Sequence, residues 1–187
     1  KEVLRYRDAY PVSIVRPPMV YGPRDKGVFV MIQTVARNFM PIMQGSAPGG
    51  NKYYSAIHVK DLARGIVQSG VAPLSKVPSG EVFYLAGDGV HTYRELLGTI
   101  AEKLNCDPLK IRIPKFAVTF AAAAATVAGA VTRKTFPLNW DKLNEILPDY
   151  WICSNEKAKA QLGFAPEFDL SQGMANAIEW YQRQKWL

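Results

Sequence analysis

Hydrophobic positions follow two spacings along this chain, and their order predicts strands alternating with helices. Residues 12–15 form a short apolar run typical of a buried strand, whereas residues 27–39 place apolar side chains three and four apart, which predicts a helix. The other expected strands lie at residues 41–44, 53–58, 81–86 and 110–114. The other expected helices lie at residues 1–10, 60–69, 92–104, 116–131, 139–147, 154–162 and after 171.

Three of the expected helices carry local signals that fix an end or a face. Thr92 and Glu95 match the capping box, in which each side chain accepts a backbone N–H of the first turn. Ser154 is expected to cap the helix that follows it, and Gly163 to end that helix. The last helix has an apolar stripe that should face the core: Met174, Ala177, Ile178 and Tyr181.

The balance of elements changes along the chain. Strands alternate with helices up to about residue 90, and helices dominate after it. Alternating strands and helices are typical of α/β folds, in which helices cover a mostly parallel sheet. The sequence therefore predicts an α/β chain with a sheet-bearing first part and a mostly helical second part.

Composition narrows the class of protein. The chain has 187 residues, of which 48% are hydrophobic, which is enough for one substantial core and at most two small domains. The net charge is +7, but the basic residues are scattered, so the sequence favours a solvated surface and no nucleic-acid partner. Cys106 and Cys153 are far apart and fit a reduced, cytoplasmic setting, and no residues show metal-ligand spacing.

Residues 116–131 form an uncharged, alanine-rich segment that raises the question of a membrane. A spanning helix needs about 20 predominantly apolar residues, and this segment is shorter than that. We therefore expect a buried helix or a lid over a pocket. The less favoured alternative is a binder of anionic membrane surfaces, with this segment as its interfacial element.

Arg16-Pro17-Pro18 ends the first expected strand in an unusual way. Neither proline has a backbone N–H, so the chain must leave the sheet there as an extended loop. Loops at the carboxyl ends of strands line the ligand crevice in open α/β sheets. This stretch is therefore either one wall of a ligand site or a rigid exit turn without a ligand.

Two segments resemble a known family. The stretches "VRPPMVYGPRDKG" and "YSAIHVKDLARGI" are similar to the extended short-chain dehydrogenase/reductase family, whose members include epimerases and dehydratases. The double proline and the closing segment look closest to the dihydroflavonol-reductase and 3β-hydroxysteroid-dehydrogenase-like branch. The resemblance implies the C-terminal part of a Rossmann-like doubly wound fold, with residues 1–40 as the tail of the NAD(P)-binding domain and residues 41–187 as a substrate-binding region.

The resemblance also implies which residues form the site. Contacts to the nicotinamide end of NAD or NADP would come from Pro17, Pro18, Met19 and Val20. Contacts to a small-molecule substrate would come from Tyr21, Arg24 and His58. Nucleotide-sugar epimerases usually have asparagine where this chain has Met19, which favours an apolar substrate. From the residues alone, His58 could instead close a turn, and Asp61 could act on its helix dipole.

Two features that this family needs for catalysis are missing from the 187 residues. No glycine-rich turn of the dinucleotide-binding kind is present. Tyr181 and Lys185 have the spacing of the catalytic Tyr-x-x-x-Lys pair but belong to the last helix, so we expect core packing and a solvated lysine. We therefore expect the substrate-binding portion of an NAD(P)-dependent oxidoreductase or epimerase that acts on a carbonyl or hydroxyl. The alternative is a non-catalytic module of the same fold, and an unpaired sheet edge leaves a homo-oligomer open.

Overall fold

The computed structural model describes residues 2–132 and 147–187, so the helix expected at 139–147 lies outside the described residues apart from its last position. The strands are β1 (Ser13–Arg16), β2 (Met19–Tyr21), β3 (Phe39–Met43), β4 (Tyr53–Tyr54), β5 (Ala56–His58), β6 (Glu81–Tyr84), β7 (His91–Thr92), β8 (Leu109–Ile113) and β9 (Tyr150–Trp151). The helices are η1 (Val3–Tyr6), α1 (Lys26–Ala36), η2 (Pro48–Gly50), α2 (Val59–Val71), α3 (Tyr93–Lys103), α4 (Lys115–Thr132), α6 (Glu156–Leu162) and α7 (Leu170–Arg183). The predicted α/β fold class is confirmed.

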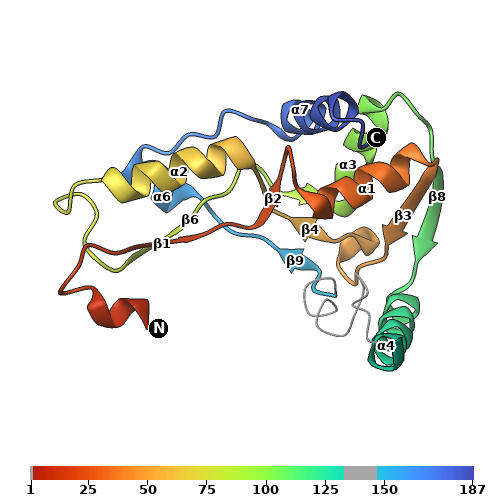
Figure 1. Cartoon of the computed structure of the whole chain (residues 1–187), viewed down its shortest axis with the longest axis horizontal. Helices are drawn as coiled ribbons and strands as arrows, with labels where there is room; N and C mark the ends of the chain where they lie inside the picture. Colours follow the sequence, from red (N-terminus) through yellow and green to blue (C-terminus); the bar gives the residue numbers. More distant parts are fainter. Residues whose placement is uncertain (1, 133–146) are drawn as a thin grey trace.

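The strands form small sheets in which parallel pairing prevails. β1 pairs with β6, β2 with β5 and β3 with β8, each pair parallel, and β4 lies between antiparallel β7 and parallel β9. Parallel partners must be joined by a crossover, and these crossovers contain helices. α1 lies between β2 and its partner β5 in the sequence, and α1 and α2 lie between β1 and its partner β6 (Figure 1). The carboxyl ends of each parallel pair therefore lie at the same edge.

Two clusters of buried apolar residues hold the fold. The first cluster joins α1, α3, α7 and β3, and its members exposed by 1% or less are Ile32, Val35, Leu96, Leu97, Ile100, Met174, Ala177 and Tyr181. The second cluster lies between β6, α2 and α6, and consists of Ile57, Val77, Phe83, Leu85, Ala158 and Phe164. The predicted stripe of the last helix belongs to the first cluster and is confirmed.

The local signals at helix ends mostly hold. Thr92 and Glu95 form the predicted capping box at the start of α3. Gly163 ends α6 in the left-handed conformation at φ 66°, which glycine adopts without strain. The predicted Ser154 cap is wrong by one position, since the N-cap residue of α6 is Asn155. Ser154 nevertheless takes part, because its hydroxyl oxygen accepts the N–H of Glu156 at 3.2 Å.

The strand expected at residues 53–58 divides into β4 and β5 at Ser55. Tyr53 and Tyr54 pair with β9 and β7, whereas residues 56–58 pair with β2. Ser55 is fully buried between the two, and its hydroxyl donates to the carbonyl of Cys153. The alternation of the sequence could not reveal this division, because it depends on partners far along the chain.

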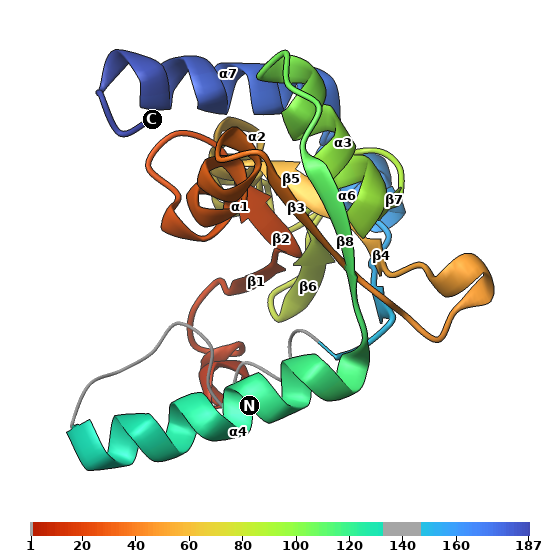
Figure 2. The ribbon, with the colours of Figure 1, turned by 90° about the vertical axis from the view of Figure 1, so that its right-hand side faces the viewer.

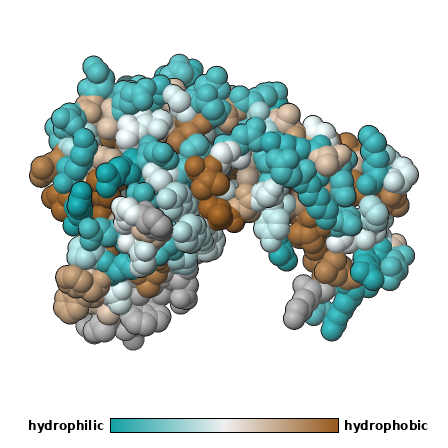
Figure 3. Space-filling view, turned by 180° about the vertical axis from the view of Figure 1, so that it is seen from behind, coloured by the Kyte–Doolittle hydropathy of each residue, from teal (hydrophilic) through white to brown (hydrophobic). Residues whose placement is uncertain are grey.

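The segment that forms α4 was expected to be a buried helix or a lid over a pocket, and it is not a buried helix. It runs along the lower edge of the ribbon, apart from α1, α3 and α7 (Figure 2). Phe116 and Phe120 are each 77% exposed. Among the described residues, no helix has both the length and the apolar character needed to cross a bilayer. The space-filling view shows a wide hollow on the lower side, between the ends that carry α4 and η1 (Figure 3).

Candidate cofactor and substrate site

Pro17 and Pro18 join the end of β1 to the start of β2. β1 lies beside β6 in parallel register, with Arg16 opposite Tyr84 at the carboxyl ends of both strands. The Arg16 guanidinium lies 3.5 Å from the Tyr84 hydroxyl. Because two parallel strands end together here, this edge is where an open α/β sheet places its ligand crevice.

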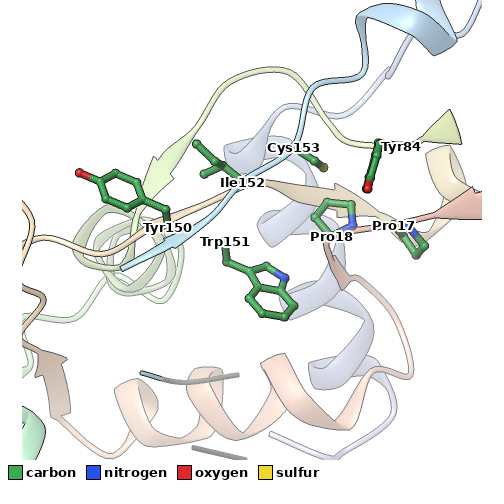
Figure 4. A pocket seen from close by; sticks show the side chains of 7 residues that line it. All are labelled: Pro17, Pro18, Tyr84, Tyr150, Trp151, Ile152 and Cys153. Carbon is green, nitrogen blue, oxygen red and sulfur yellow. The ribbon is translucent and has the colours of Figure 1, made fainter. Parts of the chain in front are cut away.

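A pocket of about 220 Å³ occupies this edge (Figure 4). One wall comes from the ends of β1 and β6, and the other from β9 and the residues after it. Its lining residues are Pro17, Pro18, Tyr84, Tyr150, Trp151, Ile152 and Cys153. The pocket is therefore a largely flat-faced, aromatic space, since two proline rings, two phenols and an indole make most of its lining.

The second wall is held in place by β4. The rings of Tyr53 and Tyr150 stack with centroids 5.4 Å apart and planes 4° from parallel. Ser55 and Cys153 exchange two hydrogen bonds: the Ser55 hydroxyl donates to the Cys153 carbonyl, and its oxygen accepts the Cys153 N–H at 3.1 Å. Trp151 lies between Tyr150 and Cys153, which are held by Tyr53 and Ser55. The backbone that carries its indole is therefore held on both sides.

Asp149 fixes the entry into β9. One carboxylate oxygen lies 2.8 Å from the Lys115 ammonium at the start of α4 and 3.9 Å from the buried Lys52 ammonium. The other oxygen accepts the N–H of Ser46 at 3.0 Å. The bond from Lys115 is the main cause that lowers the pKa of Asp149, and burial opposes it. The start of α4 is therefore tied to the strand that forms the second wall.

Among the described residues, those that line the pocket carry no carboxylate, ammonium, guanidinium or imidazole group. Burial raises the pKa of the Cys153 thiol, and the Ser55 hydrogen bond opposes this only in part. The thiol is therefore protonated at neutral pH and is not a reactive thiolate. The arrangement can bind and orient a flat, uncharged group, but no lining side chain is set up as a general base.

Tyr21 and His58 lie in the core and outside the lining of this pocket. They face each other across β2 and β5, with ring centroids 5.6 Å apart. Tyr21 is 2% exposed, and its hydroxyl donates to the Asp169 carbonyl at 3.2 Å. A Cβ on Gly173 would lie 2.4 Å from the Tyr21 hydroxyl oxygen, so α7 approaches this ring as closely as glycine allows. Burial is also the main cause that raises the Tyr21 pKa.

His58 is the N-cap of α2. Its Nδ1 accepts the Lys60 N–H at 3.4 Å, and its ring stacks on Phe168 with centroids 4.0 Å apart. Its Nε2 is also buried. Burial lowers the His58 pKa, and the charge of Asp61 and a side-chain hydrogen bond with Asn176 oppose this. These contacts support the interpretation that His58 closes a turn. Its contact with a substrate stays a prediction.

Asp61 does more than act on the dipole of its helix. It is 1% exposed, and its two oxygens accept the N–H groups of Glu167 and Phe168, each at 3.1 Å. Arg64 also donates to it at 2.7 Å and pairs with Glu167. Asp61 therefore fastens the segment before α7 onto α2, a role that no local pattern could reveal.

The remaining predicted site residues surround β2. Met19 and Val20 are half-buried and pack against the first and second clusters respectively. Arg24 is exposed and has a left-handed backbone at φ 72°. Among the predicted cofactor residues, the structure brings only Pro17 and Pro18 into the pocket lining. The contacts of Met19, Val20 and Arg24 with a ligand stay predictions.

Sequence reasoning missed the pocket residues that lie outside the proline loop. Tyr84 could have been found, because it ends a strand that is parallel to β1 and must reach the same edge. The second wall, residues 150–153, had no such signal, since it reaches the pocket only through the pairing of β9 with β4.

Tyr181 and Lys185 behave as predicted. Tyr181 is fully buried, and its hydroxyl lies 2.9 Å from the Gly22 carbonyl oxygen and 2.6 Å from that of Asp25. Burial, more than any other cause, raises its pKa to about 12. Lys185 is exposed beyond the end of α7. Within the described ranges, no group of histidine, cysteine, aspartate and glutamate could hold a metal ion.

Comparison with known proteins gives distant likenesses. No protein-family model matches the chain. The chain is 27% identical over 175 residues to ceramide reductase of Caulobacter vibrioides, covering 93% of this chain and 52% of that protein. Among solved structures, an epimerase of Methanothermobacter thermautotrophicus superposes with a TM-score of 0.71 at 16% identity, covering 98% of this chain and 47% of that one. The dTDP-glucose 4,6-dehydratase of Bacillus anthracis, solved with NAD, gives a TM-score of 0.65 at 19% identity, with coverages of 98% and 49%.

The chain spans about half the length of the proteins it resembles. Nearly all of its own length is covered in these superpositions. At these identities the likeness concerns the fold. The chain has the Rossmann-like α/β fold found in the matching half of epimerases and dehydratases.

Proposed function

We propose that this chain is the substrate-binding half of an NAD-dependent oxidoreductase or epimerase. Residues 1–40 would end its dinucleotide-binding domain, and residues 41–187 would bind the substrate. The observation that carries the proposal is the aromatic pocket at the carboxyl ends of β1 and β6, with the proline loop as one wall.

The shape of the pocket suits the nicotinamide end of the cofactor. Pockets for whole drug-sized ligands measure roughly 300–1,000 Å³, so about 220 Å³ suits one ring system and not a whole dinucleotide. Pro17, Pro18 and Trp151 offer flat apolar faces on which a planar ring can pack. The NAD in the solved dehydratase favours NAD, and NADP stays open. When bound, the cofactor would supply or accept the hydride.

The substrate would meet the nicotinamide beside this pocket and would be an uncharged carbonyl or hydroxyl compound with an apolar body. Among the described residues, the pocket lining carries no charged group to bind a phosphate or carboxylate of such a compound. The likeness to a ceramide reductase supports a lipid carbonyl, since a ceramide is largely hydrocarbon. Reduction of a carbonyl needs a hydride at carbon and a proton at oxygen. This chain would orient the substrate, and the proton donor would come from the other half.

A second groove supports a docked dinucleotide-binding half. It measures about 360 Å³ and runs along β1 and the end of α2, between residues 11–15 and 66–77. Ile66, Val67 and Val71 on α2 are 49%, 62% and 76% exposed. A parallel sheet normally has both faces covered by other elements. Among the described strands, β1 pairs only with β6, so its other edge has no strand partner there.

The test is a fluorescence titration with NADH of the polypeptide that joins this chain to the residues encoded before it. Binding should quench tryptophan emission by energy transfer to the nicotinamide, because Trp151 lies in the pocket. Trp151→Phe should lower this transfer more than Trp186→Phe does, since Trp151 lines the pocket whereas Trp186 packs on Phe29 and Tyr181. If the joined polypeptide binds neither NADH nor NADPH, the proposal is wrong.

The non-catalytic alternative has one observation in its favour, which is that no side chain is set up as a general base among the described residues that line the pocket. A polypeptide that binds cofactor and substrate but transfers no hydride would support it. The titration and a turnover assay together separate the two functions.

A further inference from the structure

Arg16 and Tyr84 meet at one edge of the aromatic pocket. They lie opposite each other in β1 and β6, and the guanidinium of Arg16 donates toward the hydroxyl oxygen of Tyr84 at 3.5 Å. A guanidinium can only donate hydrogen bonds, so the Tyr84 oxygen is the acceptor in this contact. Among the described residues, the Tyr84 hydroxyl donates to no acceptor. Its proton is therefore left for water or for a ligand.

Two hydrogen-bond donors of the lining lie on the side of the proline loop. Figure 4 shows the oxygen of Tyr84 on the part of its ring that is nearer to Pro17 and Pro18. The indole nitrogen of Trp151 likewise lies on the ring edge that is nearer to Pro18. The hydroxyl of Tyr150 points to the opposite side, away from both prolines. Tyr84 and Trp151 can therefore donate to one ligand that packs on the proline loop.

The side chains of the lining offer few acceptors to such a ligand. Proline and isoleucine side chains have no polar atom, an indole only donates, and a thiol sulfur is a weak acceptor. Of the two tyrosine oxygens, that of Tyr84 already accepts from Arg16. A small number of polar groups usually fixes the orientation of a ligand in an apolar pocket. A fitting ligand therefore has a flat apolar body and supplies an acceptor oxygen.

We propose that the pocket binds a planar carbonyl compound and that the Tyr84 hydroxyl donates a hydrogen bond to its carbonyl oxygen. The indole N–H of Trp151 is the second donor. Arg16 is a positioning residue, because its own donation to the Tyr84 oxygen turns the hydroxyl proton toward the ligand. The inference rests on the proposed function for the two sources of this carbonyl, which are the carboxamide of the nicotinamide and the carbonyl of the substrate.

The first test compares two probes that differ only in the carbonyl. The 187-residue chain is titrated by NMR with 3-acetylpyridine and with 3-ethylpyridine, in which a methylene group replaces the carbonyl group. The ratio of the two affinities should fall by about two- to tenfold in Tyr84→Phe, which removes only the hydroxyl. Tyr150→Phe is the matched control and should keep the wild-type ratio, because its hydroxyl points away from the proline loop.

Three results of this titration would overturn the proposal. Neither pyridine binds the wild type, or the ratio is the same in the wild type and in Tyr84→Phe. The third is that nicotinate, which carries a carboxylate in place of the acetyl group, binds more tightly than 3-acetylpyridine, since Arg16 would then bind an anion. Tyr84 is 43% exposed, so the fold should tolerate its loss of a hydroxyl, which circular dichroism can verify.

The second test concerns Arg16. Arg16→Met keeps an unbranched side chain but removes the donor to Tyr84. It should lower the affinity ratio less than Tyr84→Phe does and leave the affinity for 3-ethylpyridine unchanged. A merely structural role would weaken the binding of both pyridines alike, and that result would contradict the positioning role.

The third test identifies the source of the carbonyl in the polypeptide that joins this chain to the residues encoded before it. If NADH displaces 3-acetylpyridine, the pocket binds the carboxamide of the cofactor. If both bind together, it binds the carbonyl of the substrate. If neither NADH nor NADPH binds while the ratio still depends on Tyr84, the proposed function fails and the carbonyl site stands. If the cofactor binds but the ratio does not depend on Tyr84, this inference alone fails.

Discussion

The two core clusters differ in how completely they are enclosed. The first has fifteen buried members among the described residues, and α1, α3 and α7 surround it (Figure 1). The second has six, and beside it lies the groove between β1 and α2 with exposed apolar side chains on its rim. Both clusters contain side chains that are wholly buried, so the difference lies in their surroundings and not in burial itself.

This difference indicates which cluster contributes more to the stability of the chain. Hydrophobic stabilisation grows with the apolar area removed from water, so the larger, enclosed cluster contributes more. The second cluster carries β1 and β6, the strands that form the first wall of the pocket. The stability of the pocket therefore depends on the less enclosed cluster.

The largest expected effect comes from matched truncations in the two clusters. Ile100 and Ile57 are both fully buried, one in each cluster. Replacing a buried isoleucine with alanine costs about 2–5 kcal/mol of unfolding free energy, and the cost depends on how far the site can relax. Ile100→Ala should lie near the upper end and Ile57→Ala near the lower end, as measured by urea unfolding. Equal losses of unfolding free energy, or a larger loss in Ile57→Ala, would show that enclosure does not make the first cluster more stabilising.

A smaller effect is expected where α7 and α2 are fastened together. Asp61→Asn keeps one acceptor oxygen but leaves one of two buried N–H groups, those of Glu167 and Phe168, without a partner. The loss should be about 1–3 kcal/mol in the free energy of unfolding. Glu167→Gln is the control, because that side chain pairs with Arg64 at the surface and should change stability by under about 1 kcal/mol. If both variants lose the same amount, the carboxylate of Asp61 is not the fastening group.

The smallest effect is a pH dependence that arises between the clusters, at His58. Burial lowers its pKa in the folded chain below the ordinary value of 6.5, against the charge of Asp61 and with that of Lys60. Below that value the unfolded chain binds more protons than the folded chain, so stability falls as pH falls through 6.5 toward the lowered pKa.

Unfolding midpoints measured from pH 8 down to about pH 5 should therefore decrease for the wild type. His58→Asn keeps an N-cap acceptor and should flatten this range, whereas His91→Gln should not. The pKa values of Asp88 and Asp149 lie below the ordinary value of 3.8. These groups therefore change the stability at more acidic pH, outside the range from pH 8 to about pH 5. An unchanged slope in His58→Asn would mean that another group titrates.

The sequence predicted the features whose causes lie within a few residues. The capping box of Thr92 and Glu95 and the stripe of α7 are local, and both are present. The proline loop was predicted to be either one wall of a ligand site or a rigid exit turn, because proline cannot continue a strand ladder. Pro17 and Pro18 line a pocket, and its ligand stays a prediction. These features need only the spacing of neighbours along the chain.

The features that escaped prediction depend on partners far apart in the sequence. Ser55 divides a strand because Cys153 lies beside it, 98 positions later. Asp61 finds its partners 106 and 107 positions later. Trp151 reaches the pocket through β4. Periodicity carries no information about such pairings, so the second wall of the site could come only from the structure.

The spread of the pocket over the chain has a consequence for biosynthesis. Its parts are residues 17–18, residue 84 and residues 150–153, so it closes only after the last of these has left the ribosome. At roughly 5–20 residues per second, Trp151 is synthesised about 7–27 seconds after the proline loop. A protease cut between these parts would leave most helices intact yet separate the walls, so loss of ligand binding would precede loss of helical signal.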